Sequence, residues 1–124
     1  MPNTFLILGA INAFLCVAIG AFGAHGLKEK LSTDMLAVYQ TAVQYHFYHA
    51  LGLAAVGLVL AHFPKSWPVA LSGWMMLAGI VLFSGSLYVL SLTGMRWLGA
   101  ITPIGGVAFL LGWVLLAYGM WAAK

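Results

Sequence analysis

Seven side chains that can form hydrogen bonds or move protons lie within ten residues of the chain. They belong to the stretch YQTAVQYHFYHALG (39–52) and are Gln40, Thr41, Gln44, Tyr45, His46, Tyr48 and His49. Histidine titrates near neutral pH, so it can relay protons or bind a metal, and glutamine and tyrosine can hydrogen-bond a ligand. The surrounding segment 35–61 is otherwise mostly apolar. Because polar groups in such a segment are costly in a bilayer and normally turn toward partners or water, this stretch is the candidate functional centre.

The composition is that of a membrane protein. The chain has 124 residues, of which 64% are hydrophobic and 6% are charged, whereas a soluble domain of this size needs a charged surface. Four segments, at about 4–24, 35–62, 67–92 and 102–122, reach the roughly 20 apolar residues that a bilayer crossing requires. Backbone groups in lipid must be hydrogen-bonded within the segment, so these spans should be helices. The predicted fold class is all-α, a polytopic membrane protein with one four-transmembrane-helix bundle over residues 1–124.

Most polar residues near the spans fall on one side of the membrane. Four crossings place the loops after the first and third spans on the same side. His25, the stretch 40–49, the stretch 84–91 and Thr102 all lie in the halves nearer those loops. The half nearer the second loop is almost pure hydrocarbon. We therefore predict one polar intramembrane cluster in a single leaflet. Its members are His25, Gln40, Gln44, Tyr45, His46, Tyr48, His49, Ser84, Ser86, Tyr88 and Thr102.

The spacing within the second span predicts which of its faces meets the bundle. At about 100° per residue, seven residues cover one half of the helix. They are Gln40, Thr41, Gln44, Tyr45, Tyr48, His49 and Gly52. We expect this half to face inward, with His46 just beyond its edge.

Three interpretations of the cluster stay open. It could line a pocket that binds a ligand or passes a solute or proton. His25, His46 and His49 could hold a metal or haem, since histidines three apart on a helix can share a metal. Alternatively, the polar groups could only hydrogen-bond neighbouring helices, as we expect for Asn12 in the first span.

Catalytic and metal chemistry find little support in the residue types. The acids of the chain, Glu29 and Asp34, lie near the first loop, so the metal ligands that usually accompany histidine are missing from the cluster. Paired-carboxylate catalysis is disfavoured for the same reason, and the sequence contains no Ser-His-acid pattern or phosphate loop. We therefore predict a protein that is not an enzyme and that has neither a metal site nor a cofactor.

The expected partners are membrane lipid and a second copy of the chain. Small residues recur every seven positions in the third and fourth spans, which permits close helix packing within or between chains. These seams are Ser72, Gly79 and Ser86, and Gly105, Gly112 and Gly119. The net charge of +3 comes from five cations and two acids, and the cations are scattered over all the loops as Lys28, Lys30, Lys65, Arg96 and Lys124. Because no basic cluster forms, nucleic acid is not an expected partner.

Four motifs in order resemble the YgdD/YwdK family of small membrane proteins, over nearly the whole chain. They are GAFGAHGL (20–27), TAVQYHFYHALGL (41–53), FSGSLYVLSLTG (83–94) and TPIGGVAFLLGW (102–113). The resemblance implies a multi-pass protein of the bacterial cytoplasmic (inner) membrane with four helices. It implies no catalytic residues, because that family is a domain of unknown function.

Together these features predict a non-enzymatic binding or scaffold protein with a polar intramembrane pocket in one leaflet. The alternative is a small transporter or channel component, which the histidines could link to protons.

Overall fold

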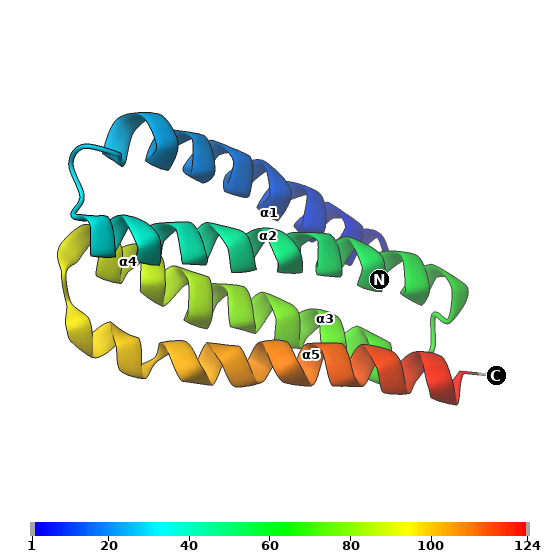
Figure 1. Cartoon of the computed structure of the whole chain (residues 1–124). Helices are drawn as coiled ribbons and strands as arrows, with labels where there is room; N and C mark the ends of the chain where they lie inside the picture. Colours follow the sequence, from blue (N-terminus) through cyan, green and yellow to red (C-terminus); the bar gives the residue numbers. More distant parts are fainter. Residues whose placement is uncertain (1, 124) are drawn as a thin grey trace.

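A computed structural model describes residues 2–123 of the chain. Met1 and Lys124, one of the cations counted above, lie outside the described residues. The described chain is helical and contains no strand. Four helical stretches are long and apolar enough to cross a membrane, namely Asn3–Leu27, Thr33–His62, Trp67–Thr93 and Arg96–Ala122. The predicted fold class, an all-α polytopic membrane protein, is therefore confirmed (Figure 1).

The first two spans are joined by a short loop. Helix α1 (Pro2–Phe22) continues through one wide π-helical segment, η1 (Gly23–Leu27), before the chain turns. Helix α2 (Thr33–His62) begins after Ser32, whose hydroxyl oxygen accepts a hydrogen bond from the backbone N–H of Met35 at 3.1 Å. Ser32 is therefore the N-cap of α2, because its hydroxyl satisfies one of the free donors of the first turn.

The third and fourth spans are interrupted helices. Helix α3 (Trp67–Gly79), the π-helical segment η2 (Ile80–Ser84) and helix α4 (Gly85–Thr93) run on without a loop. Gly94 ends this span in the left-handed conformation (φ 75°) that favours glycine. A short 3-10 helix, η3 (Arg96–Ala100), occupies the predicted loop, and helix α5 (Thr102–Ala122) carries Pro103 in its first turn.

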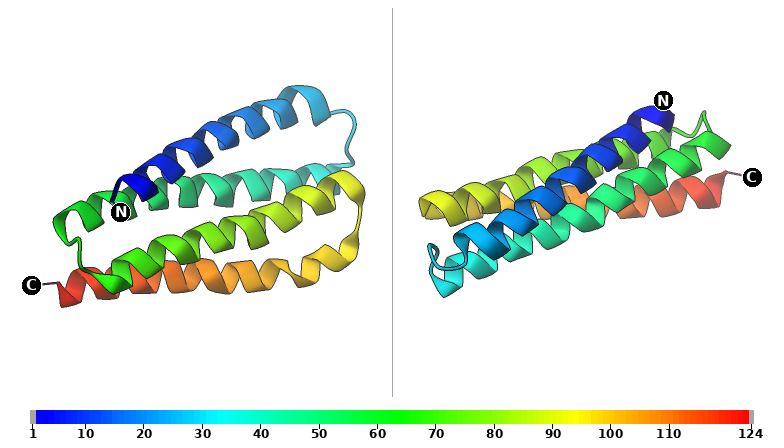
Figure 2. Two further views of the ribbon diagram at one scale, coloured as in Figure 1. Left: turned by 180° about the vertical axis from the view of Figure 1, so that it is seen from behind. Right: turned by 90° about the horizontal axis from the view of Figure 1, so that it is seen from above.

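The helices run antiparallel, with α2 at the centre. One end of the bundle holds the α1–α2 and α4–α5 loops, and the other end holds the α2–α3 turn and both termini (Figure 1). Helix α1 packs obliquely across α2, which packs in turn against α3, η2 and α4, while α5 packs against α3 and η2 (Figure 2). Helices α2 and α5 make little contact with each other. The two loops therefore share one side, as four crossings require.

Glycines bring the helix backbones close together. A Cβ atom on Gly9 would lie 2.8 Å from the carbonyl oxygen of Ala50, so α1 lies directly on the backbone of α2. The predicted seams pack in the same way within the chain. Gly105 meets the backbone of Phe83, Gly79 meets Phe109, and both seams are buried. This packing leaves the seams little surface for a second copy of the chain.

The hydrophobic core fills the half of the bundle nearer the termini and extends to its middle. It consists of Phe5, Leu53, Val56, Leu60, Val69, Met76, Ile80, Phe109 and Leu116. Burial of such side chains supports van der Waals packing between the helices in lipid, where the hydrophobic effect adds little. The polar residues predicted from the sequence lie toward the other end.

Replacing Gly105 with alanine should destabilise the protein. The added methyl group would overlap the backbone of Phe83 on η2, and overpacking of this kind costs about 1–3 kcal/mol. The adjacent glycine provides a matched control, because a Cβ atom on Gly106 would lie 3.8 Å from the Phe83 ring. Thermal unfolding in detergent, followed by circular dichroism, should show a lower Tm for Gly105→Ala than for Gly106→Ala. Equal values would contradict this packing.

Candidate functional site

Helix α2 is rotated relative to the orientation expected from its polar residues. His46, expected beyond the edge of the inner face, lies at the centre of the buried face and is 3% exposed. Tyr39 and Ala42 are buried beside it, whereas Gln44 and Tyr48 point away from the bundle. The predicted inward orientation of this polar half is therefore wrong. Helices α1 and α4 both pack against α2. The inner face of α2 therefore needs residues that are small or whose polar groups are all hydrogen-bonded.

The remaining residues of the predicted inner half divide between the two environments. Gln40 and Tyr45 are exposed, and Thr41 is half-buried. His49 and Gly52 are buried, as expected. The polar residues of α2 therefore do not converge on one cavity.

His46 joins three helices through both of its ring nitrogens. The Asn12 amide N–H donates to the Leu8 carbonyl oxygen at 2.8 Å, which turns its own oxygen toward His46. His46 Nε2–H therefore donates to Asn12 Oδ1 at 2.9 Å, and Nδ1 accepts from the Tyr88 hydroxyl at 2.8 Å. Because the Asn12 oxygen can only accept, a neutral His46 ring carries its hydrogen atom on Nε2. The interhelical hydrogen bond predicted for Asn12 is confirmed.

Two further hydroxyl groups join α2 to its neighbours. Tyr39 donates to the carbonyl oxygen of Ile19 on α1 at 2.6 Å. Ser84, on η2, donates to the carbonyl oxygen of Ala42 on α2 at 2.9 Å. Both hydroxyls end on backbone carbonyls, so they hold helices together and offer no free group to a ligand.

Ser86 and Thr102 form a separate contact between α4 and α5. Their hydroxyl oxygens are 2.6 Å apart, and Ser86 also donates to the carbonyl oxygen of Phe83 at 2.9 Å. The contact holds the start of α5 against α4. It lies at the end of the bundle where Ser86 and Thr102 were predicted to lie.

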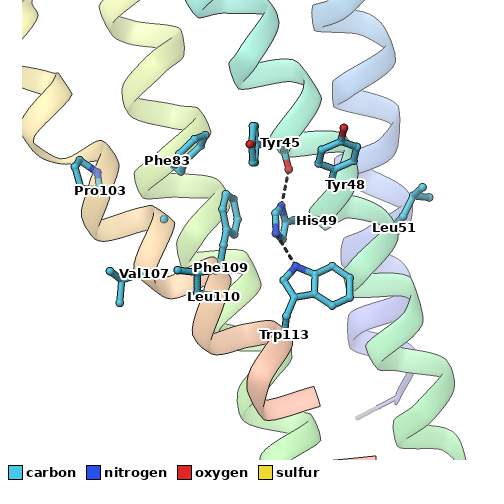
Figure 3. A pocket seen from close by; sticks show the side chains of 11 residues that line it. Tyr45, Tyr48, His49, Leu51, Phe83, Pro103, Val107, Phe109, Leu110 and Trp113 are labelled. Carbon is cyan, nitrogen blue, oxygen red and sulfur yellow. Dashed lines mark hydrogen bonds between the residues drawn. The ribbon is translucent and has the colours of Figure 1, made fainter. Parts of the chain in front are cut away.

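His49 connects α2 to α5. Its Nδ1–H donates to the Tyr45 carbonyl oxygen at 2.6 Å, and its Nε2 accepts from the Trp113 indole N–H at 3.0 Å (Figure 3). Its ring stacks on Phe109 with 3.4 Å between centroids and 6° between planes. The side chain is 4% exposed. His49 is therefore held rigidly in a single neutral tautomer, with Nδ1 protonated.

A groove of about 690 Å³ runs between α2 and α5 beside His49 (Figure 3). It is lined by Tyr45, Tyr48, His49, Leu51, Phe83, Pro103, Gly106, Val107, Phe109, Leu110 and Trp113. It lies where α2 and α5 make little contact with each other, and along α5 it runs from Pro103 past the middle of the span to Trp113. Its wall is mainly aromatic and aliphatic, where the sequence predicts a polar pocket.

Sequence reasoning missed most of the wall of this groove. By residue type, Phe83, Phe109 and Trp113 do not differ from the many other apolar residues of the spans. The usable signal was the spacing of Phe109 and Trp113, which lie one turn apart and therefore on one face of α5.

The three histidines do not share a site. His46 points toward α1 and α4, and His49 points toward α5. His25 is exposed on η1, beside Lys28, Glu29 and Lys30 at the loop end. Within residues 2–123, no three histidine, cysteine, aspartate or glutamate side chains come close enough to hold a metal.

Comparison with known proteins agrees with the resemblance noted in the sequence. Residues 19–106 match the family model described as "Protein of unknown function (DUF423)". The UPF0382 membrane protein YwdK of Bacillus subtilis (strain 168) is 56% identical over 92% of this chain and 93% of its own length. A UPF0382 membrane protein of Staphylococcus saprophyticus is 53% identical over 94% of this chain and 96% of its own. No solved structure matches the chain.

Removing the His46 ring should destabilise the bundle markedly. His46→Leu leaves the Asn12 oxygen and the Tyr88 hydroxyl without their partner, and unpaired buried groups cost about 1–3 kcal/mol each. His62→Leu is the control, because His62 is exposed and makes one bond of 3.3 Å. It should change the free energy of unfolding by less than about 0.5 kcal/mol, as measured in detergent.

A double-mutant cycle separates the hydrogen bond from general packing. Tyr88→Phe should cost less in the His46→Leu background than in the wild type, because its partner is already lost. Strictly additive effects would show that the His46–Tyr88 bond contributes nothing to stability.

Proposed function

The chain belongs to the DUF423 family of membrane proteins, and we propose that it binds the hydrocarbon chain of a bilayer amphiphile in the groove between α2 and α5. In this proposal it is a non-enzymatic binding protein. Its location in the bacterial cytoplasmic membrane follows from the resemblance to the YgdD/YwdK family and is part of the same proposal.

The observation that carries this function is the size and lining of the groove. Its volume of about 690 Å³ falls in the roughly 300–1,000 Å³ range of small-molecule sites. The wall consists mainly of aromatic and aliphatic side chains (Figure 3), and in this proposal the groove opens toward the lipid. An apolar wall open to lipid favours a hydrocarbon chain over a polar solute.

The length of the groove suits part of one hydrocarbon chain. Along α5 it extends from Pro103 in the first turn to Trp113, which is about 15 Å at 1.5 Å per residue. The hydrocarbon core of a bilayer is roughly 30 Å thick, so the groove spans about half of it. We infer that the polar end of the amphiphile lies toward the loop side, near Pro103.

The floor of the groove is already organised without a ligand. His49 is bonded to the Tyr45 carbonyl and to Trp113, and it stacks on Phe109. No buried side-chain nitrogen or oxygen among residues 2–123 lacks a hydrogen-bond partner. A polar ligand would therefore gain no unpaired group in the floor, whereas a hydrocarbon chain requires none.

The alternative function, a transporter or channel component, would need a polar path across the whole bundle. The half nearer the termini is filled by core side chains such as Phe5, Val56 and Leu60. This filling supports the binding role over the transport role.

Filling the groove should displace the bound chain. Gly106 lines the groove, and a Cβ atom there has room, so Gly106→Leu should occupy part of it. Displacing two methylenes should weaken binding about tenfold, at roughly 0.8 kcal/mol each. The measurement is photolabelling in vesicles by a phospholipid with a diazirine in its acyl chain, followed by peptide mapping. Labelling should concentrate on α2 and α5 at the groove and fall in Gly106→Leu.

The matched control is Gly85→Leu on α4. Gly85 is also a helical glycine with room for a Cβ atom, 3.8 Å from its nearest neighbour, and it lies outside the groove lining. Labelling spread evenly over all lipid-facing helices, or unchanged in Gly106→Leu, would rule out the groove as a binding site.

A further inference from the structure

Gln44 and Tyr48 form a polar pair on the outer face of α2. The Gln44 amide N–H donates to the Tyr48 hydroxyl oxygen at 2.6 Å. Both side chains are exposed, and Tyr48 retains 48% of its accessible surface. They lie one turn apart, on the side of α2 opposite the buried His46. In a single copy of the chain this pair faces lipid.

The pair lies near the middle of the membrane. His46, which lies between the two residues in the sequence, bonds to Asn12 close to the centre of the Asn3–Leu27 span. His49 stacks on Phe109, at the centre of the Arg96–Ala122 span. Two independent contacts thus place this part of α2 at the depth where neither water nor lipid headgroups are present.

Hydrogen-bonding capacity remains unused at this depth. The bond between the two side chains leaves the Gln44 carbonyl oxygen, one Gln44 N–H and the Tyr48 hydroxyl proton without a partner among the described residues. Unpaired polar groups in the hydrocarbon core are costly. A glutamine in this position is expected to hydrogen-bond to another helix.

We propose that this helix is α2 of a second copy, and that the outer face of α2 is a self-association surface centred on Gln44. A carboxamide is both donor and acceptor, so two Gln44 side chains can exchange two hydrogen bonds across a two-fold axis. Copies inserted in the same orientation have that axis along the membrane normal. Each residue of α2 then meets its own counterpart at equal depth, which makes a second copy the partner that best fits a lone glutamine.

The neighbouring residues permit close approach. Thr41 and Ala55 lie on the same outer face and are only half-buried, and small residues at such positions let helices pack closely in lipid. This surface differs from the seams containing Gly79 and Gly105, which are buried within the chain. It adjoins the groove, since Tyr48 and Leu51 also line the groove, but its central residue Gln44 does not.

Cysteine cross-linking tests the surface directly. Cys16, the single cysteine of the chain, is first replaced by alanine. Leu51→Cys then marks the outer face of α2 seven residues after Gln44, while Val17→Cys on α1 and Val114→Cys on α5 mark other exposed faces near mid-membrane. Oxidation in native membranes should give covalent dimers for Leu51→Cys and not for the two controls.

A second measurement isolates the glutamine. Gln44→Leu should lower the dimer association constant about 3- to 30-fold, the range that an interhelical hydrogen bond contributes in membranes. Energy transfer between labelled copies in phospholipid vesicles, followed as lipid is added, gives this constant. Gln44→Asn, which keeps a carboxamide, should lose less. Because Gln44 is exposed, the Tm of the Gln44→Leu monomer should stay unchanged.

Three results would overturn self-association at this face. They are equal cross-linking at Leu51→Cys and Val17→Cys, cross-linking of Leu51→Cys to a different protein only, and an unchanged association constant in Gln44→Leu. Groove photolabelling reports separately on lipid binding, and it should persist in Gln44→Leu.

Discussion

All four ring nitrogens of His46 and His49 are hydrogen-bonded, and these bonds fix how the helices are rotated against one another. His46 is hydrogen-bonded to Asn12 of α1 and to Tyr88 of α4, and His49 is hydrogen-bonded to Trp113 of α5. In hydrocarbon, an imidazole without partners would be costly, so a rotation of α2 that broke these bonds would be penalised at several points at once. The two histidines therefore tie every span of the bundle to α2.

The π-helical segment η2 helps to bring the third span into register with α2. Its wide turn is closed by a bond from the Gly85 N–H to the Ile80 carbonyl, one residue further than in an α-helix. The extra residue turns α4 relative to α3. Ser84, the last residue of η2, reaches the Ala42 carbonyl, and Tyr88, one helical turn later in α4, reaches His46. In a regular helix, Ser84 and Tyr88 would be rotated away from their partners on α2. The π-helical turn is therefore needed for both hydrogen bonds.

Composition and topology were sufficient to predict the fold class and the end of the bundle at which Ser86 and Thr102 meet. Apolar length determines that the segments cross, and the number of crossings determines that the Ser86 and Thr102 hydroxyls lie at the same end as Gln44. The rotation of α2 could not be predicted in this way. The usual rule is that polar residues in a membrane helix face the other helices. In α2 the inner face is instead decided by the close contact with Gly9 and by the hydrogen bond of His46 to Asn12. Both contacts depend on three-dimensional packing. The groove was missed because Phe109 and Trp113 have the composition of ordinary lipid-facing residues, and only their contact with His49 sets them apart.

The same hydrogen bonds help to decide what the histidines do. The chain from the Tyr88 hydroxyl through His46 and Asn12 ends on the Leu8 carbonyl oxygen, and a backbone carbonyl cannot pass a proton onward. His49 likewise donates to a backbone carbonyl, that of Tyr45, and accepts from an indole N–H, a group that has no proton to exchange at ordinary pH. A proton relay needs side chains that alternate between donor and acceptor, and neither histidine is linked to a continuing series of them. Their bonds instead suit a structural role, in which His46 holds α1, α2 and α4 together and His49 stiffens the wall of an apolar groove.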